Sequence, residues 1–380
     1  MDFEFNETQK QLQTTARNFL KSECPLSLVR ELLDSEPGYS PELWRKMAEL
    51  GWLSLIFPQR YGGDEASPLD LAVIYEEMGR ALMPSPHLSS VVLSGLAILA
   101  GGSEEQKTNF LPKIGNGELV FTLALTEPEC DWSASSISTS AIANGNHFIL
   151  KGTKLFVPYV HAADYVLCVA KTRDSGVPEN DVSLFIVDAQ ASSGLKCNRL
   201  SGFLGEPLCE VALENVIVPS ENLLGRLNKG WTYLTSAIEA GTVMQCCEMV
   251  GGADFVLELT INYVKQRTQF GQFIGSFQRV QDRIINMLND LDKARLFAYE
   301  AAWRLSESLP CHLEISIAKV AASESYDNIC NESHYVHAGI GFMSDYDLYL
   351  YTRKAKTTKN YLGSPGFHRK IVAEELAKWA

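Results

Sequence analysis

The sequence has no uninterrupted apolar run of the roughly 18 residues that a membrane-spanning helix needs. Its first residues, MDFEFNETQKQL, lack the apolar stretch of a secretory signal peptide. None of its nine cysteines has the C-x-x-C spacing of a zinc or redox motif. These absences predict a cytoplasmic protein with reduced thiols, no metal site and no membrane association.

Basic residues are also scarce. The 380 residues include 33 lysines and arginines against 46 aspartates and glutamates, which gives a formal net charge of −13. Binding to nucleic acid or to an anionic membrane needs clustered cations, so we expect neither partner. The acidic total still permits a local basic pocket for a phosphorylated ligand. A hydrophobic fraction of 46% is typical of a globular enzyme.

The hydrophobic pattern changes twice along the chain and predicts three domains. Residues 1–117 are predicted to form short helices; in SPELWRKMAEL, for example, Ser40 can cap a helix that begins at Pro41. Residues 118–225 contain five short β-branched or aromatic runs between turn signals, which predicts a small antiparallel barrel or sandwich. Residues 226–380 return to long helices, so the predicted fold class is α+β with a C-terminal bundle.

The helix expected in the segment that starts at residue 275 is amphipathic. Its apolar residues recur at i, i+3 and i+4 spacing: Phe277, Val280, Ile284, Ile285, Leu288 and Leu291. This stripe suits a helical bundle, and we expect the bundle to provide the surface of a dimer or a tetramer.

The most distinctive stretch is YVKQRTQFGQFIGSFQRVQ. We expect Arg267 to end a long helix, Phe270 and Gly271 to form a turn, and Phe277 and Gln278 to begin the next helix. An arginine at this place can clamp a pyrophosphate, and Phe270 can stack on a planar ring. The stretch alone is equally compatible with a plain helix–turn–helix that carries an exposed arginine.

Four motifs resemble those of the flavin-dependent acyl-CoA dehydrogenases: LTEPE at 125–129, GTKLFV at 152–157, RTQFGQFIGSFQ at 267–278 and HAGIGF at 337–342. They occur in the family's order and with its gaps, and the resemblance covers essentially the whole chain. The sequence, including LGSPGFHRKIVAEEL near its end, is most similar to bacterial members that work as paired, unlike subunits.

The resemblance implies an N-terminal α-helical domain, a middle β domain and a C-terminal four-helix bundle. It also implies α,β-desaturation of an acyl-CoA thioester, in which a carboxylate removes the α-proton and the β-hydrogen leaves as hydride to FAD. The implied partners are the acyl-CoA substrate, an electron-transfer flavoprotein, and a homologous subunit in a homo- or hetero-oligomer.

The same resemblance places seven residues at FAD-binding positions. Four match positions near the adenine and pyrophosphate of a neighbouring subunit's FAD: Arg267, Phe270, Gln278 and Gly339. Three match positions beside the isoalloxazine ring: Leu125, Thr126 and Phe156. Tyr335 stands where a Gln is usual in the family.

The positions beside the isoalloxazine ring depart from the family pattern at two places. The family's Gly-Ala-Gly-Ser continuation is replaced by Glu129, Cys130, Asp131 and Trp132. The family's Trp-x-Thr becomes Phe156, Val157 and Pro158, and proline has no N–H or hydroxyl to donate to the flavin. We therefore expect a remodelled ring site, in which Trp132 and Phe156 narrow the pocket or stack on a cyclic acyl group.

Neither of the family's two positions for the catalytic base holds a carboxylate, because they read Leu362 and Gly241. The remaining catalytic candidates are Asp131 and Glu239. Glu239 lies two residues before Gly241, an offset of about 200° around a helix, and a cap or a ligand contact is its alternative role. Asp131 is also compatible with a local turn. Thr242, together with Trp132 and Leu362, is expected to bind substrate.

Three hypotheses follow. The chain is a subunit that lends Arg267 and Phe270 to the FAD of a non-identical partner; or it is a self-sufficient flavoenzyme whose base is Asp131 or Glu239; or it carries out non-redox acyl-CoA chemistry, such as hydration or lyase cleavage, without flavin. We expect acyl-CoA dehydrogenase-like chemistry, with the paired-subunit hypothesis first.

Overall fold

The computed structural model describes residues 4–378, so the ends of the first and third predicted domains, 1–3 and 379–380, lie outside the described residues. Contacts within the chain define two compact units. The helical unit comprises residues 1–30, 67–83 and 242–380, and the sheet unit comprises residues 31–66 and 84–241. Because each unit is assembled from separate stretches, the division into three consecutive domains stays a prediction.

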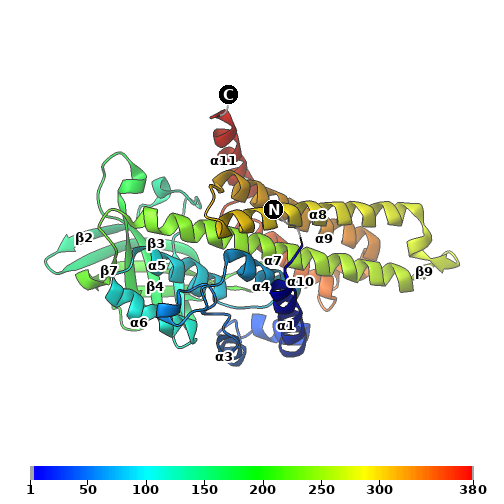
Figure 1. Ribbon diagram of the computed structural model, residues 1–380, viewed down its shortest axis with the longest axis horizontal. Helices are drawn as coiled ribbons and strands as arrows, with labels where there is room; N and C mark the ends of the chain where they lie inside the picture. The colour runs from blue at the N-terminus through cyan, green and yellow to red at the C-terminus, as the bar shows by residue number, and fades with distance from the viewer. Residues whose placement is uncertain (1–3, 379–380) are drawn as a thin grey trace. The chain divides into compact units, whose positions relative to one another are not determined.

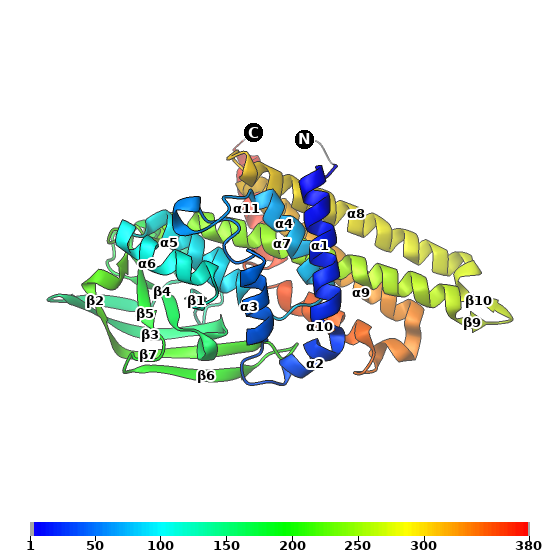
Figure 2. The ribbon, with the colours of Figure 1, turned by 60° about the horizontal axis from the view of Figure 1, so that its bottom comes forward.

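The sheet unit contains, within residues 4–378, one sheet of eight strands (Figure 2). The spatial order is β6-β7-β3-β2-β4-β5-β8, and β1 pairs with β4. The strands are β1 Phe121–Ala124, β2 Ser140–Asn144, β3 His147–Pro158, β4 Tyr165–Lys171, β5 Val182–Asp188, β6 Leu195–Ser201, β7 Pro207–Pro219 and β8 Leu223–Leu224.

The sheet is mostly antiparallel, as predicted, but β4 has parallel neighbours in β1 and in one residue of β2, which the prediction missed. β3 pairs antiparallel with β7, β7 pairs antiparallel with β6, and β4 pairs antiparallel with β5. β1 instead runs parallel to β4, with Phe121 beside Tyr165 and Ala124 beside Cys168. Four residues are too few to reveal the direction of a partner strand. Along β7 buried and more exposed residues alternate, which is the pattern of a strand with one face on a core.

Short helices accompany the sheet in this unit. They are α3 Pro41–Glu49, a π-helix Leu88–Gly95, α5 Leu96–Gly101 and α6 Glu104–Gly115, while α2 Leu26–Leu33 lies at the unit's boundary. The predicted start of α3 is confirmed, because the Ser40 hydroxyl accepts a hydrogen bond of 3.1 Å from the Leu43 amide and Pro41 is the first helical residue. Helix α7, Gly230–Gln266, begins in the sheet unit and continues into the helical unit.

The helical unit contains the long helices predicted for the C-terminal region (Figure 1). They are α8 Gln278–Ser306, α9 His312–His337, α10 Asp347–Thr358 and α11 Pro365–Ala377, and they are joined by α1 Glu7–Glu23 and α4 Pro68–Arg80 from the N-terminal region. No helix among the described residues is long and apolar enough to cross a membrane.

Two glycines let α4 and α7 approach each other closely. A Cβ on Gly79 would lie 1.9 Å from the Glu248 carbonyl oxygen, and one on Gly251 would lie 1.8 Å from that of Glu76. Only glycine fits at both places, so the N-terminal segment is packed tightly against the bundle.

The apolar stripe of α8 is only partly covered within one chain. Met287 and Leu291 are buried, but Ile285 and Leu288 remain exposed. Because exposed apolar side chains gathered on one helix face are typical of association surfaces, the pattern agrees with the expected oligomer.

Candidate functional site

The arm between α7 and α8 is a short hairpin at one end of both helices (Figure 1). Strands β9 Thr268–Gln269 and β10 Gln272–Phe273 pair antiparallel, and Phe270 and Gly271 form the turn with φ of 54° and 80°. Two successive positive φ values are those of the turns that suit two-residue hairpins. The predicted turn is confirmed, and α8 begins at Gln278, as expected.

The arm carries two exposed side chains that were predicted to bind a cofactor. Arg267 is exposed, and its side chain has no hydrogen bond or ion pair with any other described residue. Phe270 is 93% exposed and touches only the edge of Phe277 among the aromatic rings described, with 6.2 Å between ring centres. A guanidinium without an internal partner and an uncovered ring are suited to a ligand or another chain.

The other two residues matched to the adenine side are also exposed. Gln278 is the first residue of α8, and Gly339 lies in the 3₁₀ turn that follows α9. A Cβ on Gly339 would meet no atom within 4 Å. Tyr335, at the position where a Gln is usual in the family, is exposed as well, with the Arg283 guanidinium 4.5 Å from its ring centre.

The loop after β1 is fixed by a buried ion pair. Glu127 and Lys154 are almost completely buried, and the Lys154 Nζ donates to Glu127 Oε1 at 2.6 Å and to the Leu125 carbonyl at 3.2 Å. The second Glu127 oxygen accepts the Ser138 amide at 2.8 Å. Leu125 and Thr126 are therefore held between β1 and β3, and sequence reasoning missed Lys154, which lies in the GTKLFV motif.

Burial alone would raise the pKa of the Glu127 carboxyl. The charge and hydrogen bond of Lys154, with the hydrogen bonds from Ser138, outweigh burial and hold that pKa below its ordinary value. The carboxylate is thus committed to the ion pair, so it is not an available proton acceptor.

The Asp131 carboxylate accepts hydrogen bonds within its own turn. Its Oδ1 accepts the Trp132 amide at 2.6 Å and its Oδ2 accepts the Ser133 hydroxyl at 3.2 Å. The turn also holds Cys130 at a positive φ of 53°. This geometry supports the local turn role of Asp131, and Trp132 beside it is half-buried.

The second ring segment contains a β-bulge. The register between β3 and β7 shifts between Lys154 and Val157, and Phe156 has a φ of 56° at this irregularity. Bulges redirect a side chain and often lie next to active sites. Phe156 is 42% exposed and can still stack on a ring, whereas Pro158 has no amide hydrogen to donate.

The residues matched to the substrate and the base lie on α7 and on the turn between α10 and α11. Glu239 is half-buried on α7, and Thr242 is buried on the same helix. Leu362 is also buried, with a left-handed φ of 56°. A leucine in this conformation is strained, so neighbouring groups have to hold the turn.

Two buried side chains close to this turn were not predicted. The His368 Nε2 lies 2.9 Å from the Leu362 carbonyl, and its Nδ1 lies 3.2 Å from the Ser316 hydroxyl. Lys319 donates to Gln245 Oε1 at 2.5 Å and to the Thr358 carbonyl at 2.8 Å. Burial lowers the pKa of Lys319 to about 7 and the pKa of His368 to about 4.

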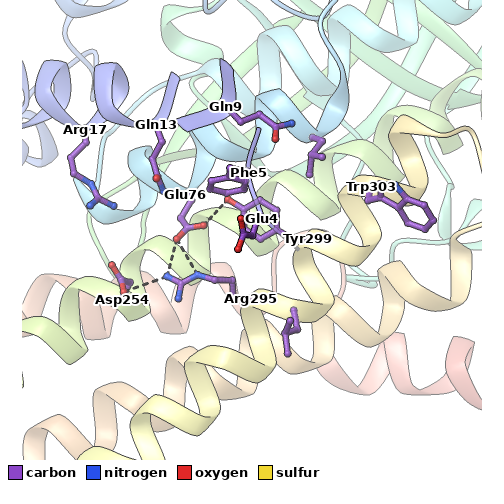
Figure 3. A pocket seen from close by; sticks show the side chains of 12 residues that line it. Glu4, Phe5, Gln9, Gln13, Arg17, Glu76, Asp254, Arg295, Tyr299 and Trp303 are labelled. Carbon is purple, nitrogen blue, oxygen red and sulfur yellow. Dashed lines mark hydrogen bonds and ion pairs between the residues drawn. The ribbon is translucent and has the colours of Figure 1, made fainter. Parts of the chain in front are cut away.

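The helical unit also holds a cavity of about 420 Å³ between α1, α4, α7 and α8 (Figure 3). In it Arg295 lies between two carboxylates, 2.9 Å from Glu76 and 3.3 Å from Asp254, and the Tyr299 hydroxyl donates to Glu76 at 2.6 Å. Because no predicted site residue lines the cavity and these charges already pair, it is distinct from the predicted cofactor and substrate positions.

The structure thus separates the predicted residues into two groups along one rigid element. From Thr242 to Gln266, 24 residue steps along α7, the helix rises about 36 Å. Thr242 and the arm residue Arg267 therefore lie far apart along α7.

Comparison with protein families gives three matches in sequence order. The family described as "Acyl-CoA dehydrogenase, N-terminal domain" matches residues 6–118, its middle domain matches residues 122–216, and its C-terminal domain matches residues 228–377.

Individual relatives align over nearly the full length. The chain is 30% identical to "Probable acyl-CoA dehydrogenase YngJ" of Bacillus subtilis, with 100% of both chains covered. It is 31% identical to "Caffeyl-CoA reductase-Etf complex subunit CarC" of Acetobacterium woodii, with 98% of this chain and 99% of the relative covered. A solved structure of the ChsE4–ChsE5 complex from Mycobacterium tuberculosis is similar, with a TM-score of 0.89, 27% identity and 99% of each chain covered.

Proposed function

Because the chain belongs to the acyl-CoA dehydrogenase family of oxidoreductases, we propose that it takes part in FAD-linked α,β-desaturation of an acyl-CoA thioester as a subunit beside a homologous partner. The relative whose name is caffeyl-CoA reductase is named for the opposite direction of hydrogen transfer. The proposal therefore concerns removal of hydrogen from the α- and β-carbons, or its addition to them in the reverse direction.

The observation that carries the paired-subunit proposal is the separation along α7. Arg267 and Phe270 are exposed and without internal polar partners, about 36 Å of helix away from Thr242. This distance supports the proposal that a dinucleotide bound by the arm extends into a second subunit rather than to Thr242 of the same chain. The similar ChsE4–ChsE5 structure is a complex of two named chains, which supports a partner that is a different chain.

The residues of the arm fit the adenine and pyrophosphate part of FAD. The Arg267 guanidinium can give two parallel hydrogen bonds to phosphate oxygens, Phe270 can stack on the purine, and the open space at Gly339 leaves room for close approach. The ring half fits less well, because Pro158 cannot donate a hydrogen bond. When bound, FAD supplies the electron acceptor for the β-hydrogen.

This chain's own residues do not provide the family's base. Leu362 is apolar and buried, and Gly241 has no side chain. Asp131 is engaged in its turn, which argues against the self-sufficient enzyme with this residue as base. Glu239 remains a catalytic candidate on α7. We propose that the chain's main contribution is to bind and orient the partner's cofactor.

The test is the ligand content of the purified protein. The chain expressed alone is expected to be colourless, and co-expression with a homologue of the same family is expected to give a complex with flavin absorbance and one FAD per pair by mass. Yellow protein with one FAD per subunit from the chain alone would instead support the self-sufficient enzyme. Colourless protein that converts a thioester alone would support non-redox chemistry.

The remaining partners are also proposals. A relative belongs to a complex with Etf by its name, and we propose an electron-transfer flavoprotein as the redox partner of the assembled pair. Reduction of that protein by the complex and thioester, followed at the flavin absorbance, tests this. The cytoplasmic location stays a prediction from the sequence.

A further inference from the structure

Helix α9 carries two buried polar residues one turn apart on the same face, Ser316 and Lys319. Both are directed to the segment that connects α10 to α11. Lys319 holds the carbonyl of Thr358 at 2.8 Å, and Ser316 lies 3.2 Å from the His368 ring, whose other nitrogen lies 2.9 Å from the Leu362 carbonyl. One helix face therefore fixes both ends of the turn at 358–364.

The same lysine also reaches α7. Its Nζ donates to Gln245 Oε1 at 2.5 Å, and Gln245 lies three residues, or about one turn, beyond Thr242. A single amino group thus connects the α7 segment next to Thr242 with the turn that carries Leu362. These are two of the segments expected to contact the thioester.

The turn needs such support because of its backbone. Leu362 and Gly363 have φ of 56° and 102°. A Cβ on Gly363 would lie 2.6 Å from His368 Nε2, so the imidazole packs directly against the glycine. A strained leucine persists only where the surroundings determine its conformation, and here the surroundings are His368 and Lys319.

We propose that Lys319, with His368 and Ser316, is a positioning residue that holds the α7 segment at Thr242 and the turn at Leu362 in place for the acyl group of the thioester. The inference rests on the proposed function for the ligand and for the substrate positions of Thr242 and Leu362. That Lys319 holds the turn can be tested without any ligand.

The ligand-free test is hydrogen exchange of the full-length chain. In Lys319→Met, which keeps the length of the side chain and removes its donors, peptides that cover 358–364 are expected to exchange more than tenfold faster. The matched control is Thr260→Val, which removes a buried 2.7 Å contact with Ser333 between the same helices α7 and α9. It should leave these peptides unchanged. Equal protection in Lys319→Met and wild type would overturn the inference.

The binding test separates a local role from general loss of structure. Calorimetric titration with butyryl-CoA, octanoyl-CoA and coenzyme A itself should show that Lys319→Met lowers the affinity for the two thioesters at least tenfold. The affinity for coenzyme A should change less than twofold. Equal weakening of all three, or of none, contradicts the pocket role. A wild-type chain that binds no thioester, alone or with its partner, contradicts the proposed function, whereas the exchange experiment still decides whether Lys319 holds the turn.

Discussion

The arm at 267–278 and the segment at 125–158, which consists of the loop after β1 with β2 and β3, contain the two halves of the expected cofactor site, and they use their polar groups in opposite ways. In the arm, Arg267 has no internal partner and Phe270 is almost fully exposed. In the loop, Glu127 is paired with Lys154 and Asp131 is bonded to the next two residues. The arm is therefore organised for binding, whereas the loop is organised for its own stability.

The proposed paired-subunit function accounts for this difference. Side chains that bind a ligand of another chain gain nothing from internal contacts, so they remain exposed in the single chain. A loop that no longer has to donate to a ring can replace its glycines by residues such as Asp131 and Trp132, which make local contacts. Four predictions test this comparison.

The largest expected effect is on stability, at Lys154. Lys154→Met leaves the Glu127 carboxylate buried without its cation, which typically costs about 3–5 kcal/mol. Urea unfolding measures the loss. The double variant Lys154→Met/Glu127→Gln should recover at least half, because the amide oxygen can still accept from Ser138. A loss below about 1 kcal/mol would show that the pair does not hold the loop.

The next effect is on cofactor retention, at Arg267. Arg267→Ala removes charge-assisted hydrogen bonds worth about 1.5–3 kcal/mol, so FAD should dissociate from the assembled pair roughly 10- to 100-fold more readily. Unfolding of the single chain should change by less than about 0.5 kcal/mol, because the side chain has no internal partner. Arg279→Ala, also exposed in this region, is the matched control. If both variants retain FAD equally, the arm does not bind it.

The third prediction concerns the pH dependence of stability. Burial lowers the pKa of Lys319 from its ordinary value of 10.5 to about 7 in the folded chain. Between these values the unfolded chain holds a proton that the folded chain has released, so stability rises with pH, by up to ~1.4 kcal/mol per pH unit. Lys319→Met should lose this rise between pH 7 and 10, as measured by denaturation at several pH values. If the free energy of unfolding rose with pH equally in both proteins, the lowered pKa of Lys319 would be contradicted.

The smallest effect is expected at Asp131. Asp131→Ala removes the acceptor of the turn and should cost about 1 kcal/mol, while Asp131→Asn keeps an acceptor and should be nearly neutral. Neither change should reduce turnover of the assembled pair by more than about twofold. A loss of turnover of a hundredfold or more in Asp131→Asn would mean that this carboxylate is the base after all, and that the loop is catalytic.

The sequence alone predicted those features of the fold that depend on residues close together in the chain. The Ser40 cap, the turn at Phe270–Gly271 and the start of α8 each depend on residues within a few positions of one another, and local signals of this kind can be read directly. The family resemblance then predicted the order of the domains and an FAD-binding role for Arg267.

What only the tertiary structure decided involves partners far apart in the chain. The Glu127–Lys154 pair spans 27 residues and the Lys319–Gln245 bond spans 74, and no local pattern shows which of the 33 basic residues is buried. The parallel pairing of β1 with β4 could likewise not be predicted from the four residues of β1. The physical reason is that burial and charge pairing depend on which segments the fold brings together, whereas caps and turns depend only on the neighbouring backbone.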